Sequence, residues 1–209
     1  MVKTMKTEGE YMEARILKTA EDLFLEQGFA KTTMGQIAHR VGCNQALVHY
    51  YYRTKEKLFE QVFEEKISYI AGHILAIDEG EGSFEEKIAR MVGAHFDFLV
   101  QNPFFVPFIV GELLDNPGRF APLLDRHGHY PREIFSMLDV ELQREVARGT
   151  IRPITTFDLV ATVMSLNIAP FLMLPAVRHV TTLPDDAAEE WLAARRGEII
   201  ETVLSRIRL

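Results

Sequence analysis

Polar side chains that could read DNA bases are concentrated in residues 44–51, Asn-Gln-Ala-Leu-Val-His-Tyr-Tyr. In a helix, Gln45 and His49 would share one face, because they are four positions apart. A glutamine amide can form two hydrogen bonds with adenine, and the methyl group of Ala46 can contact thymine. A histidine can reach a base or a phosphate, and tyrosine hydroxyls can bind phosphates. The segment therefore predicts DNA contacts by Asn44, Gln45, Ala46, His49, Tyr50 and Tyr51.

These residue types also have purely structural roles. Asn44 is a favourable N-cap and could serve only to begin a helix. Tyr50 and Tyr51 could fill the core, and Tyr52 is expected to pack the short helices onto a longer one. The choice between recognition and packing depends on which side chains the fold exposes.

Two short helices joined by a tight turn would position this segment. Thr33 and Gln36 have the spacing of a capping box, which begins a helix that runs to about Arg40. Gly42 ends that helix, and Asn44 begins the next one, which runs to about Tyr51. Apolar side chains at helical spacing would face inward. This arrangement is typical of a helix-turn-helix, whose second helix enters the major groove of DNA.

Longer helices flank the motif. One is expected over about residues 10–27, ended by Gly28, and another over about residues 55–77, capped by Thr54. The N–H groups at a helix N-terminus form a natural phosphate site. We therefore add Thr33 and Lys55 to the predicted DNA contacts.

The remaining sequence also has helical periodicity, and no segment alternates apolar and polar residues as a strand would. Helices are expected over about residues 84–101, 104–114, 132–148, 156–178 and 185–208. Between the second and third of these we expect a turn at Asn116-Pro117-Gly118, a short turn of helix at 120–124 and a loop around Gly128. The sequence predicts an all-α fold, with a DNA-binding domain over residues 1–58 and a helical second domain over residues 59–209.

Composition agrees with a globular protein, at 47% hydrophobic and 25% charged residues. The formal net charge is −7, but residues 1–57 contain nine lysines and arginines against seven acidic residues. This local balance permits DNA binding by the first domain. Cys43 is the single cysteine, so no disulfide can form within the chain, which fits a cytoplasmic location. No signal peptide is evident.

Residues 159–177 contain no charged side chain and are nearly long enough to cross a membrane. Polar residues and two prolines interrupt the segment, and Asp158 and Arg178 flank it closely. A helix of a soluble protein that is buried on two sides explains the segment better. We therefore expect no membrane partner.

The N-terminal sequence resembles the DNA-binding region of TetR-family transcriptional regulators over about residues 10–63. The likeness lies in residue types at fixed spacing, namely Ala20, Phe24, Gly28-Phe29, Thr32-Thr33, Ile37-Ala38, Gly42, Tyr51-Tyr52, Lys55-Glu56 and Leu58. The sequence departs from the usual family pattern at Cys43, Asn44, Ala46 and His49, in or beside the second short helix. We expect these departures to change which operator sequence the protein recognises, and we still expect the protein to bind DNA.

The resemblance implies a homodimer that pairs through its last two helices, a palindromic double-stranded DNA operator and a small-molecule effector. It also implies a repressor that its effector releases. Abundant phenylalanine and methionine in the second domain suggest an apolar effector. The candidate residues that line its binding site are Phe96, Phe104, Phe108, Met137, Met164, Asn167 and Phe171. Each apolar candidate could instead simply fill the core. The amide of Asn167 needs a partner, which could be a ligand or a backbone carbonyl across the dimer.

Three alternative activities use other residues. An enzyme could employ His95, Asp97, His127 and His129, but no nucleophile elbow, phosphate loop or zinc-binding helix motif accompanies them. We expect no catalysis and no cofactor. Asp125, His127 and His129 have metal-compatible side chains, although we expect them in a solvated loop and expect no metal. Cys43 could sense redox state, but buried cysteines are more often inert. An architectural DNA binder without an effector would have a tightly packed second domain.

Overall fold

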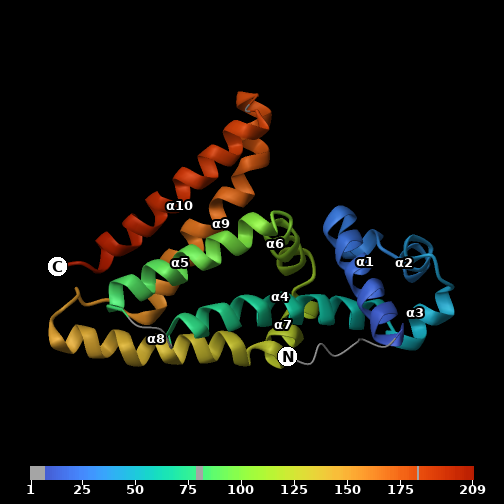
Figure 1. Cartoon of the computed structure of the whole chain (residues 1–209), viewed down its shortest axis with the longest axis horizontal. Coiled ribbons are helices and arrows are strands. Elements are labelled where there is room, and N and C mark those ends of the chain that lie inside the picture. Colours follow the sequence, from blue (N-terminus) through green and yellow to red (C-terminus); the bar gives the residue numbers. More distant parts are fainter. Residues whose placement is uncertain (1–7, 79–81, 183) are drawn as a thin grey trace. The chain divides into compact units, whose positions relative to one another are not determined.

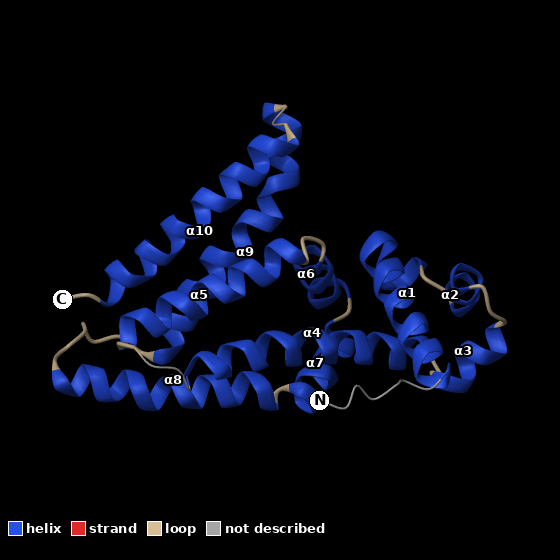
Figure 2. Ribbon diagram, in the orientation of Figure 1, coloured by secondary structure: helices blue, strands red, loops and turns tan. Residues whose placement is uncertain are grey.

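The computed structural model describes residues 8–78, 82–182 and 184–209 of the chain (Figure 1). Within these ranges it contains ten helices and no strand (Figure 2), so the predicted all-α fold is confirmed. The helices are α1 (Glu8–Lys31), α2 (Met34–Val41), α3 (Gln45–Tyr51), α4 (Lys55–Asp78), α5 (Phe84–Gln101), α6 (Phe105–Asp115), α7 (Pro117–His127), α8 (His129–Arg148), α9 (Thr156–Thr181) and α10 (Asp185–Ile207).

The chain forms two compact units. The first comprises Met1–Ile67 and Gly111–Leu123, and the second comprises Ser68–Val110 and Leu124–Leu209. The predicted functional division after residue 58 differs from this structural one. The reason is that α4 continues without a break well past residue 58.

Aromatic packing forms the core of the first unit. The ring centroids of Phe24, Phe29 and Phe59 lie 5.3 to 6.0 Å apart, and Ile37 and Val48 are fully buried beside the same helices. Phe29 reaches this cluster because the backbone leaves the helical conformation at Gly28, where φ is 82°. The expected end of the first helix at Gly28 was therefore only partly correct, since helical residues resume and continue to Lys31.

Three helices, α5, α9 and α10, pack together in the second unit, and α8 packs against α9. Helices α9 and α10 run side by side (Figure 1). Arg196 of α10 binds Asp97 of α5 through two hydrogen bonds of 2.7 and 2.8 Å. The guanidinium lies across Gly93, where a Cβ atom would come within 2.5 Å of Nη2. The missing side chain of Gly93 thus makes room for this contact between helices.

The segment from residue 116 to residue 131 differs from the sequence prediction. Instead of a single turn of helix at 120–124, the whole range Pro117–His127 is helical, and α8 begins at His129 rather than at Arg132. Asn116 alone separates α6 from α7. Pro117 and Gly118 already belong to α7, because proline is suited to the first position of a helix, where no N–H donor is needed. Gly128 keeps a helical backbone and makes only a brief break between α7 and α8.

Helix α9 exposes much of its apolar surface. In its most apolar window the mean hydropathy is 1.8, and 17% of that window is buried. Its exposed apolar residues include Phe157, Met164, Leu172, Met173 and Val180. By length and composition alone, α9 is long and apolar enough to cross a membrane. The core helix of a soluble protein meets the same criterion. The predicted burial on two sides is therefore not reached within one chain.

Candidate nucleic-acid interface and effector cavity

Local hydrogen bonds define both short helices of the motif. The backbone N–H of Gln36 donates to Thr33 Oγ1, and the backbone N–H of Thr33 donates to Gln36 Oε1 at 2.8 Å, which completes the predicted capping box. Gly42 is left-handed, with φ of 80°, and its N–H donates to two carbonyls at the end of α2. Asn44 Oδ1 accepts a 2.8 Å hydrogen bond from the N–H of Leu47 and caps α3. The predicted helix-turn-helix is confirmed.

Recognition requires that α3 expose its polar face, and the packing achieves this. Ala38 of α2 and Val48 of α3 are buried, and the two helices are in contact. A Cβ atom on Gly35 would be in ordinary van der Waals contact with Gln45 Oε1 at 3.5 Å, so α2 and α3 approach closely at this point. The inward side of α3 is therefore fixed by apolar contacts, which leaves its opposite side to solvent.

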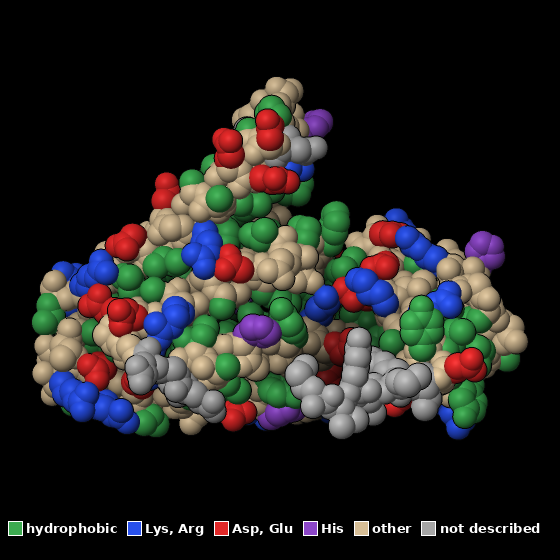
Figure 3. All heavy atoms as spheres, viewed as in Figure 1, with side chains coloured by type: hydrophobic (Ala, Val, Ile, Leu, Met, Phe, Trp, Pro, Cys, Tyr) green, Lys and Arg blue, Asp and Glu red, His purple; other side chains and the backbone are tan. Residues whose placement is uncertain are grey.

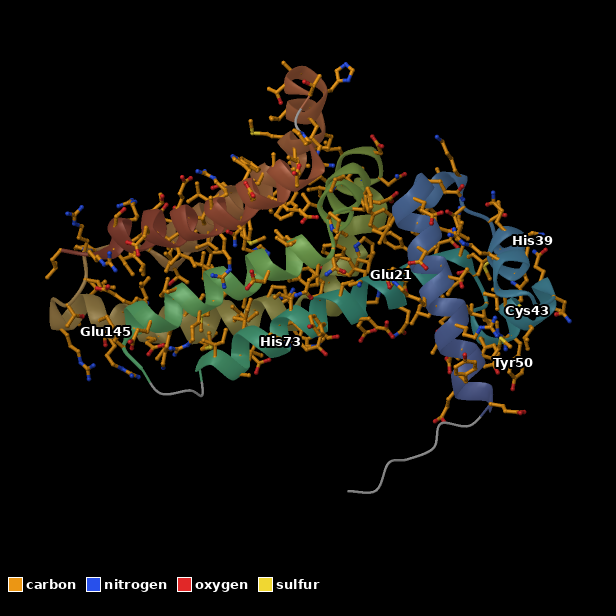
Figure 4. All side chains as sticks on the ribbon, turned by 45° about the horizontal axis from the view of Figure 1, so that its top comes forward. Glu21, His39, Cys43, Tyr50, His73 and Glu145 are labelled. Atoms are coloured by element: carbon orange, nitrogen blue, oxygen red, sulfur yellow. The ribbon has the colours of Figure 1, made fainter. Side chains whose placement is uncertain are left out.

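Four of the predicted DNA contacts lie on that solvent-exposed side, namely Gln45, Ala46, His49 and Tyr50. Tyr50 is 75% exposed, and Cys43 lies in the turn between α2 and α3 (both labelled in Figure 4). The Tyr51 ring is half-buried and packs edge-on against Tyr50 with the centroids 5.2 Å apart. The fold thus favours recognition for Tyr50 over the alternative of a core aromatic.

Tyr52 has the structural role that the sequence predicts. Its side chain is buried, and this burial, with Glu13 and Glu65 nearby, raises the pKa of Tyr52 to about 12. Burial disfavours the charged form of a phenol, so Tyr52 stays neutral at every physiological pH.

A chain of hydrogen bonds orients the side chain of Gln45. His49 Nδ1 lies 3.2 Å from the carbonyl oxygen of Arg53, and His49 Nε2 lies 3.3 Å from Gln45 Nε2. A carbonyl can only accept, so Nδ1 carries the proton and Nε2 accepts from the Gln45 amide. This bond leaves one N–H and the Oε1 atom of Gln45 available, the pair of groups that adenine would require. His49 is therefore placed to position Gln45, a role that sequence analysis did not identify.

Lys55 lies differently from the prediction of a phosphate contact. Its ammonium donates to the carbonyl oxygens of Phe29 and Thr32, both at 2.8 Å, and lies over the Phe29 ring. In this structure Lys55 joins the start of α4 to the end of α1. A phosphate contact by Lys55 remains a prediction, and it would compete with these internal bonds.

Other cations of the first unit are also engaged internally. Arg40 forms a bidentate pair with Glu26, with hydrogen bonds of 2.6 and 2.8 Å, and Arg15 donates to the carbonyl of Val41. The pair with Glu26 raises the pKa of Arg40 and lowers that of Glu26. Arg53 and Lys31 are exposed. They are further candidates for phosphate contacts that the sequence analysis did not single out.

An apolar cavity that is partly open to solvent lies within the second unit. Its volume is about 100 Å³, and residues of α4, α5, α8 and α9 line it. Of the predicted effector contacts, Met164 lines this cavity. His95 is its one polar lining side chain among Ile74, Ile88, Met91, Val92, Ile134, Leu138, Leu159, Val160, Val163 and Met164.

A larger groove of about 790 Å³ lies between α5, α6, α9 and α10. Phe96, Phe104 and Phe171 line it, as predicted for an effector site, together with Arg178 and Arg196. Phe108 and Met137 are half-buried and are not among the residues that line either space. On this face of the molecule, hydrophobic side chains are visible over α5 and α10 between charged ones (Figure 3).

Asn167 is fully buried and has found partners within its own chain. Its Nδ2 donates to the carbonyl of Val92 at 3.1 Å and lies 2.9 Å from His95 Nδ1. Within the described residues, its Oδ1 has no hydrogen-bond partner. Burial lowers the pKa of His95 to about 4, so the ring is neutral at physiological pH.

The structure describes part of the residue sets that the alternative activities would use. Asp97 is bound by Arg196, and His129 begins α8 rather than lying in a loop. The side chain of His127 lies outside the described residues. Within the described part of the chain, no group of three histidine, cysteine or acidic side chains could hold a metal ion.

Comparison with known proteins places this geometry in a family. Residues 16–62 match bacterial regulatory proteins of the tetR family, and residues 85–203 match the tetracycline repressor-like C-terminal domain. The chain belongs to the TetR family of transcriptional regulators. The helix-turn-helix and the helical second unit are therefore the DNA-binding and C-terminal regions of such a regulator.

Individual relatives agree with this family. A fatty acid metabolism regulator protein from Bacillus subtilis is 24% identical over 174 residues, which cover 73% of this chain and 89% of the relative. The HTH-type transcriptional repressor NicS from Pseudomonas putida is 31% identical over 47% of each chain. A solved tetR-family structure from Rhodococcus RHA1 has a TM-score of 0.72 at 20% identity, covering 96% of this chain and 97% of its own.

Proposed function

We propose that this regulator is a repressor that binds a palindromic operator as a homodimer and leaves it when a small, largely apolar effector binds. The observation that carries the proposal is the exposed polar face of α3. Hydrogen bonds at both ends of the helix and buried apolar contacts hold its backbone in place. In the proposed complex, Gln45 and Ala46 contact bases, and His49 contacts Gln45 and a base or phosphate. Thr33, Asn44, Tyr50, Tyr51 and Lys55 are the proposed further contacts.

The exposed apolar face of α9 supports a homodimer. Apolar side chains left in water would be stabilised by burial against a second copy, and a second α9–α10 pair presents the same residues. A two-fold protein would match a palindromic operator, with half-sites about one helical turn apart. A dimer also makes the membrane alternative unnecessary, and we propose a cytoplasmic protein.

The apolar cavity supports an effector rather than an architectural role. A tightly packed second unit would leave no such space, whereas cavities with apolar walls are typical of ligand sites. The Bacillus subtilis relative is named for fatty acid metabolism, and hydrocarbon chains suit such walls. Ile74 of α4 lines the cavity, so effector binding would act on the helix that begins directly after the DNA-binding motif. We propose no catalysis.

The experiment that tests this function has two stages. Purified protein would first select fragments from the DNA of its source organism, and fluorescence anisotropy would then measure binding across a salt series. We expect one enriched palindrome, bound with a steep salt dependence because phosphate contacts release counterions. Weak binding without sequence preference would refute operator recognition.

A further inference from the structure

The position of Lys55 is unfavourable within its own helix. Lys55 is the first residue of α4, and the N-terminus of a helix carries a partial positive charge that disfavours a cation. Its ammonium donates to the carbonyl oxygens of Phe29 and Thr32, both at 2.8 Å, where α1 ends at Lys31. The last carbonyl groups of a helix lack helical partners and favour a cation. The end of α1 therefore accounts for a lysine that α4 alone would disfavour.

The two ends of this contact enclose the helix-turn-helix. Thr32 directly precedes Thr33, the N-cap of α2, and Lys55 follows Tyr51, the last residue of α3, by four positions. Residues 33–54, which contain both short helices, therefore form a loop that the Lys55 contact closes. We infer that Lys55 is a positioning residue for operator recognition, because closing this loop fixes α3 against α1 and α4. This inference rests on the proposed function and is distinct from the phosphate contact proposed for Lys55.

The α1 side of the contact is held firmly in place. Thr32 is fully buried, and its hydroxyl donates to the carbonyl oxygen of Gly28 at 2.9 Å, with that of Leu23 also within 3.2 Å. The buried ring of Phe29 belongs to the aromatic core, and Lys55 Nζ lies 4.1 Å from its centroid, within the range of a cation–π contact. Because its acceptors belong to a buried and hydrogen-bonded segment, they fix the position of the ammonium.

The α4 side of the contact is joined to the recognition surface. Thr54 Oγ1 accepts a 3.2 Å hydrogen bond from a backbone N–H of the first turn of α4. The carbonyl oxygen of Arg53, two residues before Lys55, lies 3.2 Å from His49 Nδ1 on the exposed face of α3. Hydrogen bonds therefore run in both directions from the short link between α3 and α4. Movement of Lys55 away from α1 would move this link and, with it, the face that carries the proposed base contacts.

Positioning and phosphate contact predict different losses of affinity. A lost phosphate contact weakens binding to every DNA alike, and it reduces the slope of log K against log salt by about 0.9. A displaced α3 instead weakens contacts to base edges, which only the operator offers in the correct order. The ratio of operator affinity to affinity for unrelated DNA, called here the specificity ratio, therefore separates the two roles.

The variant Lys55→Met keeps most of the side-chain stem and removes the N–H donors. Fluorescence anisotropy would measure its binding to the operator and to an unrelated duplex across a salt series. We expect its specificity ratio to fall about tenfold, whether or not the salt slope also changes. Lys55→Arg should recover part of the ratio, because a guanidinium can also donate to two carbonyls.

Arg53→Met is the matched control, since Arg53 is an exposed cation two positions before Lys55. We expect its specificity ratio to equal that of wild type, whatever happens to its salt slope. Equal losses on the two duplexes in Lys55→Met would show that Lys55 acts only as a phosphate contact. That result, or an unchanged affinity for both duplexes, would overturn the inference.

Amide hydrogen exchange without DNA tests the positioning itself. The N–H groups of Gly42 and Tyr52 close α2 and α3 through bonds to the carbonyls of Ala38 and Val48, at 3.0 and 2.8 Å. In Lys55→Met we expect these two amides to exchange about tenfold faster, because the loop opens more readily, while amides of α1 keep their rates. Equal acceleration throughout the first unit would indicate general destabilisation. Either that result or no acceleration would contradict a role in closing the loop.

A measurement on the wild-type chain does not depend on the variants folding. In protein labelled with ¹⁵N-lysine, the Nζ protons of Lys55 should exchange with water slowly enough to be observed, because hydrogen bonds protect them. Those of exposed Lys31 should not. The Lys55 signal should persist at the same position when the operator binds. Its absence in the free protein, or its loss in the complex, would show that the two carbonyl bonds do not hold Lys55 during recognition, and the inference would fail.

These measurements separate the inference from the proposed function. If wild-type protein binds operator and unrelated DNA equally, the proposed function fails, and the exchange rates and the Lys55 signal alone decide the positioning role. If the operator is bound specifically and Lys55→Met keeps the full specificity ratio, the proposed function stands and the inference fails.

Discussion

At the scale of residues, the surface of α3 shows how one side chain can position another. Gln45 presents the groups that read adenine, but an exposed glutamine has three rotatable bonds and loses freedom when it binds. The bond from Gln45 to His49 Nε2, and that from His49 Nδ1 to the carbonyl of Arg53, restrict it before DNA arrives. The result would be a smaller entropic cost of base contact.

We predict that Gln45→Ala weakens discrimination at one base pair by about 1–3 kcal/mol, because a bidentate contact is lost. His49→Ala should weaken discrimination at the same pair by less, and the double variant should lose no more than Gln45→Ala alone. Anisotropy titrations on operators changed at single positions would measure this. His39→Ala, at an exposed histidine of α2, is the control. Additive losses would contradict coupling between the two side chains.

His95 also predicts a pH dependence of stability. Burial lowers the pKa of His95 to about 4, below the ordinary value of 6.5. Between pH 6.5 and pH 4, His95 is therefore protonated in the unfolded chain and neutral in the folded chain. The neutral ring's contribution is therefore complete above pH 6.5 and is lost as pH falls toward 4. The loss amounts to roughly 3 kcal/mol in the free energy of unfolding.

Urea unfolding at pH 7.5 and 4.5 would check this prediction by comparison of variants. Carboxylates titrate in the same range, so the informative quantity is the difference between wild type and His95→Phe. We expect the variant to lose less stability on acidification than wild type. His73→Phe, at an exposed histidine of α4, should behave as wild type, and identical slopes for all three proteins would refute the assignment to His95.

At the scale of elements, the contact between α5 and α10 depends on a missing side chain. Arg196 reaches Asp97 by lying across Gly93. This ion pair joins α10 to α5 through two residues that are 99 positions apart in the sequence. Both side chains are partly exposed, so water screens the pair, and its contribution to stability is about 0–1 kcal/mol. Its value lies in fixing the register of one helix against the other.

We predict that Gly93→Ala has a small effect on the free energy of unfolding in wild type and a larger, stabilising effect when Arg196 is absent. In wild type, the new Cβ displaces Arg196 and costs the pair with Asp97, which offsets the gain in helix propensity. In an Arg196→Ala background the obstacle is gone, and the same change should stabilise α5 by about 0.5–1 kcal/mol. Thermal or urea unfolding of the four proteins would measure both values. Equal effects in the two backgrounds would contradict the proposed steric coupling.

The helix-turn-helix could be predicted from sequence because its determinants are local. Thr33, Gln36, Gly42 and Asn44 specify where α2 and α3 begin and end through bonds to neighbouring backbone groups. The full length of α7 was not predicted, since Asn116-Pro117 is compatible both with a turn and with a helix start, and packing decides between them.

The cavity was harder to predict because it depends on how apolar faces meet. The seven candidates were selected by residue type, and of these only Met164 lines the apolar cavity. His95 was available to sequence reasoning, because it continues the apolar stripe of Ile88, Met91 and Val92 on α5. A polar side chain on such a stripe signals either a buried bond or a ligand, and here the structure provides the bond to Asn167.

At the scale of the whole molecule, α9 leaves apolar side chains exposed in the single chain, and the proposed homodimer would cover them. We predict that the wild-type chain sediments as a dimer, and that Met173→Glu shifts it toward monomer, because a carboxylate would be buried in the pairing surface. Met173 is 58% exposed in the single chain. Val140→Glu is the matched control, since Val140 is 59% exposed but lies on α8. Sedimentation over a range of concentrations would test this, and equal behaviour of both variants would place the pairing surface elsewhere.

The path of the chain between its two units has a consequence for dissection of the protein. The chain passes from one unit to the other after Ile67, Val110 and Leu123, and all three passages lie inside helices α4, α6 and α7. None is a flexible linker of the kind that proteases cut. A fragment ending at residue 58 would keep four residues of α4 and lose its remaining turns. We therefore expect a single cooperative melting transition, and no proteolytic fragment that retains operator binding on its own.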